Sequence, residues 1–489
     1  MFWDIYLPSS SWNDELLYYK QVEGVLESGV PRGYFGYNGS QAPVLPFASW
    51  SPMIMVPWMV WGKLFGWNFL SPVLCNLICL MVGMTVFAVM TIPSKKQIVA
   101  IALSFCLFTP YTRFIMCCTP EIICCSLILF YMGGVFAYEK ERKIGYLWQM
   151  NLIAGILTLM RPYFLLFLLY PVGVIKKHGK KKCMAMAVNS IFFGVGYVLI
   201  NKFMSAPYIK SIISVPFLKT FTKEGFSAGL SGFWQYVGDN MWYLKNMLSE
   251  ALRSGNYAGS VYIVYAVTGS LLLITAAMEW KNRKTEKYCK LALLTVIAYV
   301  AMMFAVFFVY SLPEGSRHLM PFLLVGFSVL GMYSAKIADK LILAALDVVI
   351  CFFFLVKPGD SYDREPPFWQ EELAENIETM QEILEEKMEY TSDIGWENTV
   401  IWLSHDIVGE NTVLEEWQQL YALPGGCGIN YCSPLYVLEN LDTLQSCYIA
   451  AIPGGEVERQ LQERNAVLLG ENERIAVYRY EGAVADGND

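Results

Sequence analysis

The segment "LALLTVIAYVAMMFAVFFVY" (291–310) contains no charged residue and is long enough to cross the apolar core of a bilayer, which takes about 20 helical residues. A second segment of this kind, "SPVLCNLICLMVGMTVFAVMTI" (71–92), lies near the start of the chain. Hydrophobic residues make up 55% of the 489 residues and charged residues only 16%, which excludes an ordinary soluble protein. The sequence therefore predicts a polytopic membrane protein.

Working outward from these two segments, we expect about ten transmembrane helices. They lie near 68–92, 98–116, 121–138, 144–160, 162–175, 184–203, 260–278, 291–310, 319–335 and 341–356. Every second connection between them is basic, and these five connections hold 17 of the 29 lysines and arginines that precede Lys357. The positive-inside rule places the basic connections in the cytoplasm and the other connections on the outer side.

The chain divides into three predicted parts. Residues 1–67 form an outer first loop, and residues 68–356 form the transmembrane bundle with a large outer loop at 204–259. Residues 357–489 hold 27 acidic and only 7 basic residues, and helix-like and strand-like patterns alternate in them. The fold class expected is a mostly α membrane bundle with a small extracytoplasmic α/β domain at the C-terminus.

Within the C-terminal part, the patterns predict a helix at 368–388, strands at "NTVIWLSH" (398–405) and "CYIAAIPG" (447–454), and a hairpin turning at Glu471-Asn472. The glycine-rich "PGGCGIN" (424–430) is interpreted as a turn, because it matches no phosphate-binding fingerprint in its strand and helix context. A bridge between Cys427 and Cys432 is possible on an oxidising side, but the spacing does not require it.

Two features of the first loop concern the membrane. The segment "SPMIMVPWMVWGKLFG" (51–66) is apolar but short and interrupted by prolines, so we expect an interfacial helix with Trp50, Trp58 and Trp61 at headgroup level. An outer N-terminal segment also has to be carried across the membrane, and no span precedes it in the sequence. We therefore expect that a first transmembrane helix is missing from this start.

An acid pair, Asp14-Glu15, opens the polar and aromatic part of the first loop. A helix beginning there aligns Asp14 with Tyr18, and Glu15 with Tyr19, along positions that continue as apolar residues. Lys20 and two glutamates then form an opposite face that we expect to be solvated. At least one acid belongs to the packed edge, although periodicity does not decide which one, and helix capping on a solvated face remains the alternative.

The segment "SGVPRGYFGYNG" (28–39) follows that helix. Its glycines allow the backbone to approach a ligand closely, and tyrosine rings suit sugars or headgroups. Arg32, Tyr34, Tyr37 and Asn38 are therefore candidate substrate contacts. An ordinary connecting loop is the alternative interpretation.

Four motifs together resemble the first outer loop of GT-C type membrane glycosyltransferases. They are "W-x-D-E-x-x-Y" from Trp12, "G-x-P-x-G-Y-x-G-Y-N" from Gly29, "F-A-S-W-S-P" from Phe47 and "L-F-G" from Leu64. That superfamily includes the protein O-mannosyltransferases, the aminoarabinose transferases and bacterial family 39 relatives, and the resemblance extends from Trp12 to about Pro321. In the family this loop follows a first transmembrane helix, which agrees with the expectation that such a helix is missing here.

The resemblance implies roles for particular residues. Asp14 matches the first-loop acid that acts as general base on the acceptor hydroxyl, and Glu15 is its neighbour and the second candidate. Glu121, in "TPEII", resembles a further acid of the family's catalytic site. The remaining matches are the basic positions at outer helix ends that hold the donor phosphate, and they are Arg161, Arg317 and His318.

The residues themselves point in the same direction. Outer loops are poor in bases, so an arginine beside a proline at a helix mouth, such as Arg161, is not explained by topology, and a guanidinium matches phosphate in a bidentate manner. Snorkelling of the arginines, helix-dipole stabilisation of Glu121 and a structural role for His318 are the alternatives. Asp347 is an acid within a span, for which we expect local pairing.

The predicted function is an inverting glycosyltransferase of the plasma or inner membrane, with a polyprenyl-phosphate sugar as donor and an acceptor hydroxyl on the outer face. The acceptor, a glycan, lipid or protein, is not specified, and no basic aromatic stripe indicates nucleic acid. Three histidines in the whole chain and no Asp-x-Asp motif lead us to expect no cofactor and no metal. The alternatives are a transporter or flippase of lipid-linked saccharides and a catalytically inactive scaffold.

Overall fold

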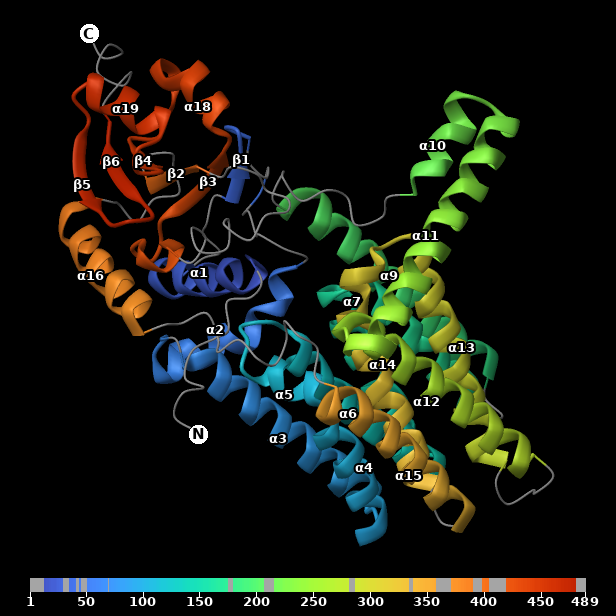
Figure 1. Ribbon diagram of the computed structural model, residues 1–489. Coiled ribbons are helices and arrows are strands. Elements are labelled where there is room, and N and C mark those ends of the chain that lie inside the picture. The colour runs from blue at the N-terminus through green and yellow to red at the C-terminus, as the bar shows by residue number, and fades with distance from the viewer. Residues whose placement is uncertain are drawn as a thin grey trace.

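The computed structural model describes residues 13–29, 35–40, 44, 51–68, 70–174, 179–205, 215–280, 286–333, 337–357, 371–389, 398–403 and 419–480. It consists of a long helical bundle and a smaller domain built on a β-sheet, which lies at one end of the bundle (Figure 1). The mostly helical membrane fold with a small α/β C-terminal domain is confirmed.

Each predicted span coincides with a helix or with a pair of consecutive helices. The helices of the bundle are α3 (Ser71–Thr91), α4 (Lys95–Leu107), α5 (Thr109–Ile115), α6 (Glu121–Glu141), α7 (Ile144–Met160), η2 (Pro162–Leu168), α8 (Leu169–Val174), α9 (Gly179–Met204), α12 (Tyr257–Glu279), α13 (Glu286–Phe308), α14 (Leu312–Tyr333), α15 (Ile337–Cys351) and η4 (Phe352–Val356). Among the described parts of the chain, five helices are long and apolar enough to cross a membrane, or six if the bent pair of α4 and α5 is one span.

The bend between α4 and α5 is 74° and occurs where Phe108 leaves the helical conformation just before Pro110. A proline in the first turn of a helix is tolerated, but it ends the hydrogen-bond ladder of the helix before it. The bend turns α5 and the following residues 116–120 back toward the start of α6. Residues 116–120 are called the α5–α6 loop below.

Helices α3 and α6 pack closely in the bundle. A Cβ atom on Gly83 of α3 would lie 2.8 Å from the carbonyl oxygen of Ser126 on α6, so glycine is required for this approach. Most of the side chains of α6 are buried, whereas α3 exposes a broad apolar surface. Helix α6 is therefore a central element of the bundle, and residues at either of its ends are well placed to be held by neighbouring helices.

The sheet of the smaller domain has the strand order β1-β3-β2-β4-β6-β5. Its strands are β1 (Phe35–Tyr37), β2 (Thr399–Leu403), β3 (Gly428–Cys432), β4 (Tyr448–Ala451), β5 (Val467–Glu471) and β6 (Ala476–Arg479). The first four in spatial order are parallel, and β5 and β6 form the predicted antiparallel hairpin. Helices α18 (Pro434–Asn440) and α19 (Glu456–Glu463) cover one face, and α16 (Glu371–Lys387) lies toward the other (Figure 1).

Strand β1 comes from the first loop and pairs in parallel with β3, so the first loop and the C-terminal part share one sheet. The interpretation of "PGGCGIN" as a turn is only half right. The turn lies at Gly425 and Gly426, and Gly428 already begins β3, which has hydrogen-bonded neighbours on both sides. Cys427 and Cys432 are buried, and no disulfide bond joins them.

Helices α1 (Asn13–Ser28) and α2 (Val56–Phe65) lie between the bundle and the sheet domain (Figure 1). The depth of Trp58 in the membrane stays a prediction. Its ring does not face lipid, because it is fully buried and its indole Nε1 donates to Asn76 Oδ1 on α3 at 3.1 Å. The other face of α2 exposes Val60 and Leu64. Trp61 is half-buried, and Trp50 lies outside the described residues.

The prediction that the face of α1 carrying Lys20 is solvated is wrong. Lys20 is only 7% exposed, forms an ion pair with Glu23 at 2.6 Å and donates to the carbonyl oxygen of Leu423. Leu423 directly follows the short helix η6 (Gln419–Ala422), which packs on α1. Periodicity shows that one face of a helix is polar, but it does not show that a segment 400 residues away covers that face.

The large loop predicted at 204–259 contains two helices, α10 (Pro216–Lys223) and α11 (Phe226–Ser254). They form a hairpin that projects beyond the end of the bundle (Figure 1). The root of the hairpin is held to the end of α13, since the Asn240 side chain donates to the carbonyl oxygen of Phe307 at 2.7 Å.

Candidate functional site

The site begins with a buried ion pair between α6 and the end of α7. Glu121 is the first residue of α6, and its Oε1 accepts a hydrogen bond from Arg161 Nη2 at 2.8 Å. Pro162 disfavours the helical conformation of the residue before it, so α7 ends and Arg161 takes an extended conformation, with φ −149° and ψ 129°. Both side chains are almost completely withdrawn from solvent, with exposed fractions of 1% for Arg161 and 0% for Glu121.

A third helix adds a histidine to this pair. Nη1 of Arg161 lies 3.2 Å from Nδ1 of His318, which is carried by α14. The hydroxyl of Tyr163 accepts from Arg161 Nη1 at 3.1 Å and lies 2.9 Å from the same histidine nitrogen. One connected group of hydrogen-bonded side chains is thus formed by Glu121, Arg161, Tyr163 and His318. We call these four residues and the adjacent Arg317 the cation cluster.

Arg317 is buried beside this group. Its Nη2 forms an ion pair with Oε2 of Glu314 at 3.4 Å, and the Glu314 side chain is largely exposed. Its charge also acts on Glu121 across the cluster. With the exposed Glu314 left aside, the buried part holds two guanidinium groups and one carboxylate. The cluster therefore carries an excess of positive charge in surroundings where an anion would be held strongly.

Glu15 is the acid of the first loop that faces the interior. Its side chain is completely buried, and its Oε2 accepts a hydrogen bond from the backbone N–H of Cys118 at 3.3 Å. Burial raises the pKa of this carboxyl well above its ordinary value, while the Cys118 N–H and the charge of Arg113 act in the opposite direction. The negative charge of Glu121 also reaches Glu15 and raises its pKa further.

The question that the periodicity left open is thus answered for one member of the acid pair. Glu15 lies on the packed edge of α1, in the same environment as the α5–α6 loop and electrostatically coupled to Glu121. Asp14 lies in the first turn of α1, but its side chain is outside the described residues.

The C-terminal part covers the other side of α1. The ring of Tyr421 packs edge-on against Tyr19 with 5.1 Å between ring centroids, and both rings are buried. Tyr421 is close enough to Glu15 for the carboxylate to disfavour its ionisation. Glu15 is therefore enclosed between the α5–α6 loop and η6.

The candidate substrate residues of the glycine-rich segment lie in the sheet. The backbone N–H of Asn38 donates to the carbonyl oxygen of Tyr431 at 2.8 Å, and its side chain Oδ1 accepts from Ser433 N at 3.0 Å. Tyr37 pairs with Tyr431 in the register of β1 and β3. Arg32 and Tyr34 are outside the described residues.

Gly36 of this segment has a structural reason. A Cβ atom on Gly36 would lie 2.1 Å from the carbonyl oxygen of Ser40 and 2.3 Å from the side-chain nitrogen of Asn430. The close approach that we inferred from these glycines therefore exists, and it is made by the protein's own chain.

Asp347 has the local partner that we expected. The hydroxyl of Ser104 on α4 donates a hydrogen bond to Asp347 Oδ1 at 3.0 Å. Sequence reasoning missed Tyr163 and Asn76. A signal existed for Asn76, because it is the only amide within the apolar segment 71–91.

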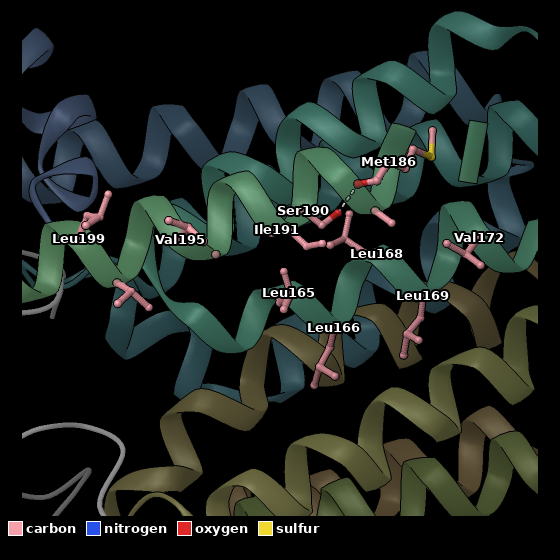
Figure 2. Close-up of a pocket in the computed structure, with 13 residues that line it drawn as sticks. Leu165, Leu166, Leu168, Leu169, Val172, Met186, Ser190, Ile191, Val195 and Leu199 are labelled. Atoms are coloured by element: carbon pink, nitrogen blue, oxygen red, sulfur yellow. Dashed lines mark hydrogen bonds between the residues drawn. The ribbon is translucent and has the colours of Figure 1, made fainter. Parts of the chain in front are cut away.

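An apolar groove runs between the segment after Arg161 and α9. Its volume is about 660 Å³, and it is lined mainly by aliphatic side chains of η2, α8 and α9. Figure 2 shows Leu165, Leu168 and Leu169 on one side and Ile191 and Val195 on the other. Within the described residues, no group of three or more histidine, cysteine or acidic side chains is placed to hold a metal ion.

No protein-family model matches the chain, and no curated protein matches it. Two solved structures are similar in fold. One is ArnT from Cupriavidus metallidurans in the apo state, with 11% sequence identity and a TM-score of 0.42, covering 95% of this chain and 92% of ArnT. The other is the same protein bound to undecaprenyl phosphate, with 11% identity and a TM-score of 0.42, covering 97% of this chain and 94% of ArnT.

At 11% identity and a TM-score of 0.42, the likeness carries no argument about what this chain does. What the site can do has to follow from its own residues.

Proposed function

We propose that this protein is a membrane glycosyltransferase that moves a sugar from a polyprenyl-phosphate carrier to an acceptor hydroxyl on the outer face of the membrane. The observation that carries the proposal is the proximity of two kinds of buried charge. Glu15 is a buried carboxyl with a raised pKa, and it lies within electrostatic reach of Glu121. Glu121 in turn is paired with Arg161 and feels the charge of Arg317, in a cluster with an excess of guanidinium charge.

The chemistry needs these two kinds of group. A polyprenyl-phosphate sugar carries its own leaving group, so the enzyme has to deprotonate the acceptor hydroxyl and stabilise the departing phosphate. A single direct displacement at the anomeric carbon inverts its configuration. A carboxylate and a set of fixed cations are sufficient for this reaction, and we propose that it needs neither a metal nor another cofactor.

We assign the role of general base to Glu15. A base acts best when its pKa is close to the working pH, and burial moves the pKa of Glu15 from its ordinary acidic value in that direction. Asp14 remains the second candidate, with the first-loop match of the sequence as its support.

We assign the donor phosphate to the cation cluster. Glu121 fixes one edge of the Arg161 guanidinium at 2.8 Å, so the charge of this arginine is oriented before the donor arrives. Arg317 and His318 line the same group from α14. In this assignment Glu121 orients the cation and does not take the acceptor proton, because its carboxylate is already committed to Arg161.

The apolar groove after Arg161 fits the lipid part of such a donor. It starts on the segment that continues from the cluster and is lined almost entirely by aliphatic side chains (Figure 2). The alternating basic connections support an outer location for the cluster and for the sheet domain. The enclosure of Glu15 by η6 implies that this cover moves when the acceptor enters.

The test compares the envelope glycans of cells that lack the gene with those of cells that carry it or a variant. Replacing Glu15 with glutamine keeps the size of the side chain and removes the base, so the product should fall by about 100-fold or more. Glu23→Gln is the matched control, since Glu23 lies on the same helix but pairs with Lys20 on the face covered by η6.

Unchanged glycans in the Glu15→Gln cells would overturn the assignment of the base, and Asp14→Asn would then be the next variant. If loss of the gene itself changes no glycan, the transferase proposal is overturned. Accumulation of the lipid-linked sugar on the inner side would indicate a flippase instead.

A further inference from the structure

Asn76 is a buried amide on the apolar helix α3, and the proposed function has not used it. Its side-chain nitrogen lies within hydrogen-bonding distance of three backbone carbonyl oxygens, at 2.8 Å from Cys117, 3.2 Å from Ile115 and 3.4 Å from Phe114. Its Oδ1 accepts from the indole of Trp58 at 3.1 Å. The amide is thus used on both sides, which also determines its orientation, because carbonyl oxygens only accept.

These carbonyls belong to the end of α5 and to the α5–α6 loop. The last carbonyl groups of a helix have no partner within the helix, and in an apolar environment each has to find one elsewhere. Asn76 supplies that partner from α3. Leucine or alanine at this position would leave the end of α5 without it.

The same loop carries the immediate surroundings of the proposed base. The N–H of Cys118 donates to Glu15. The loop then leads directly into Glu121, the first residue of α6 and the partner of Arg161. One side chain on α3 therefore holds the backbone that connects the base to the cation cluster.

We propose that Asn76, supported by Trp58, is a positioning residue that holds the α5–α6 loop so that the Cys118 N–H remains directed at the Glu15 carboxylate. The inference rests on the proposed role of Glu15 as the base. It assigns a function to a residue that touches neither donor nor acceptor and acts through the backbone of another segment.

The electrostatic consequence has a definite sign. Charged and titratable groups face Glu15 from every neighbouring element, namely Arg113 on α5, Cys117 and Cys118 in the loop, Glu121 on α6 and Tyr421 in η6. The Cys118 N–H, the charge of Arg113 and the Cys117 side chain stabilise the ionised carboxylate, whereas burial and Glu121 oppose ionisation. Loss of this hydrogen bond raises the pKa of Glu15 further and reduces the fraction of ionised base at any given pH.

The experiment measures this protonation directly on the purified full-length protein. Dicyclohexylcarbodiimide reacts with protonated carboxyls in apolar surroundings, so mass spectrometry of the Glu15 peptide at a series of pH values gives the pH of half-maximal labelling. In Asn76→Ala this midpoint should rise by about one pH unit, because the ionised carboxylate loses a hydrogen-bond donor; one unit is a tenfold change in the protonation equilibrium.

Two further variants separate positioning from stability. Trp58→Phe removes only the indole donor and keeps an aromatic ring in the buried position, so the midpoint should shift in the same direction by less than half as much. Asn151→Ala removes a buried asparagine from the middle of α7, and it should lower the melting temperature without moving the midpoint.

An unchanged midpoint in both Asn76→Ala and Trp58→Phe would overturn the inference, whatever happens to the melting temperature. The labelling does not depend on any substrate. A shifted midpoint together with normal glycans in Glu15→Gln cells would therefore refute the role of Glu15 as base while the positioning by Asn76 stands.

Discussion

Helix α6 has a buried acid at each end, and the two acids are held in different ways. At its start, Glu121 pairs with Arg161, and both side chains are almost completely buried. At its other end, Glu139 is also buried, but its partners Arg142 and Lys287 have side-chain exposed fractions of 33% and 47%. Both partners of the Glu121–Arg161 pair are withdrawn from solvent, and we call it the dry pair. The cations that pair with Glu139 remain in contact with solvent.

The energetic consequences of these two arrangements differ. Withdrawing two charges from water costs several kcal/mol for each ion, which a dry pair recovers only with good geometry and further hydrogen bonds. The Glu139 group avoids most of this cost and has a simple structural role, because Arg142 ends α6 in the left-handed conformation and donates to the carbonyl oxygen of Val174 at 3.0 Å. A costly pair at one end and an inexpensive pair at the other fit the proposed role of the Glu121 end in binding the donor phosphate.

The largest effect is expected from breaking the dry pair. Arg161→Met leaves the Glu121 carboxylate buried without its cation, which should destabilise the protein by about 3–5 kcal/mol and abolish glycan transfer. The double variant Glu121→Leu/Arg161→Met removes both charges and should regain most of the melting temperature while transfer stays absent. Recovery of transfer in the double variant would show that the pair serves stability alone.

The next largest effect is expected at Glu15 of α1, which is electrostatically coupled to Glu121 of the dry pair. Its pKa in the folded protein is raised above the unfolded value, so the stability that its neutral form contributes is present at acidic pH and is lost as the pH rises through the folded pKa. Glutamine does not titrate, so Glu15→Gln should melt a few degrees higher than the wild type at alkaline pH and show little difference at acidic pH. Melting curves of the two proteins between pH 4 and 9 check this, and parallel curves would contradict the burial of an ionisable group.

A smaller effect is expected at the other end of α6. Glu139→Gln removes a carboxylate whose partners reach solvent, so the destabilisation should be about 1 kcal/mol, with glycan transfer retained. Thermal unfolding and the glycan assay on the same preparation test both statements. A loss of transfer as severe as that of Arg161→Met would remove the contrast between the two ends.

The smallest effect is expected from chelation. Transfer by the purified protein should be unchanged in the presence of EDTA, because the proposed reaction uses guanidinium groups where other enzymes use a divalent cation. Loss of activity on chelation, restored by one added metal, would contradict the metal-free mechanism.

Several parts of the candidate site could be predicted from the sequence. Arg161 stands out because a charged residue beside a proline at the end of an apolar segment has no topological reason. Glu121 and His318 adjoin predicted spans in the same way, although α14 begins at Leu312 and so includes His318. The structure brings these three residues into contact. Tyr37 and Asn38 show the limit of such reasoning, since a glycine-rich pattern predicts close approach but does not say what is approached.

The sequence by itself predicted a membrane protein, the positions of its helices and an acidic α/β domain after them. These properties depend on local runs of apolar residues and on charge counts, which each segment carries independently of its neighbours. Only the tertiary structure decided that Glu15 faces inward, that η6 covers Lys20 and that β1 joins the C-terminal sheet. Those facts arise from contacts between segments hundreds of residues apart, and periodicity within one helix or strand contains no information about its distant partner.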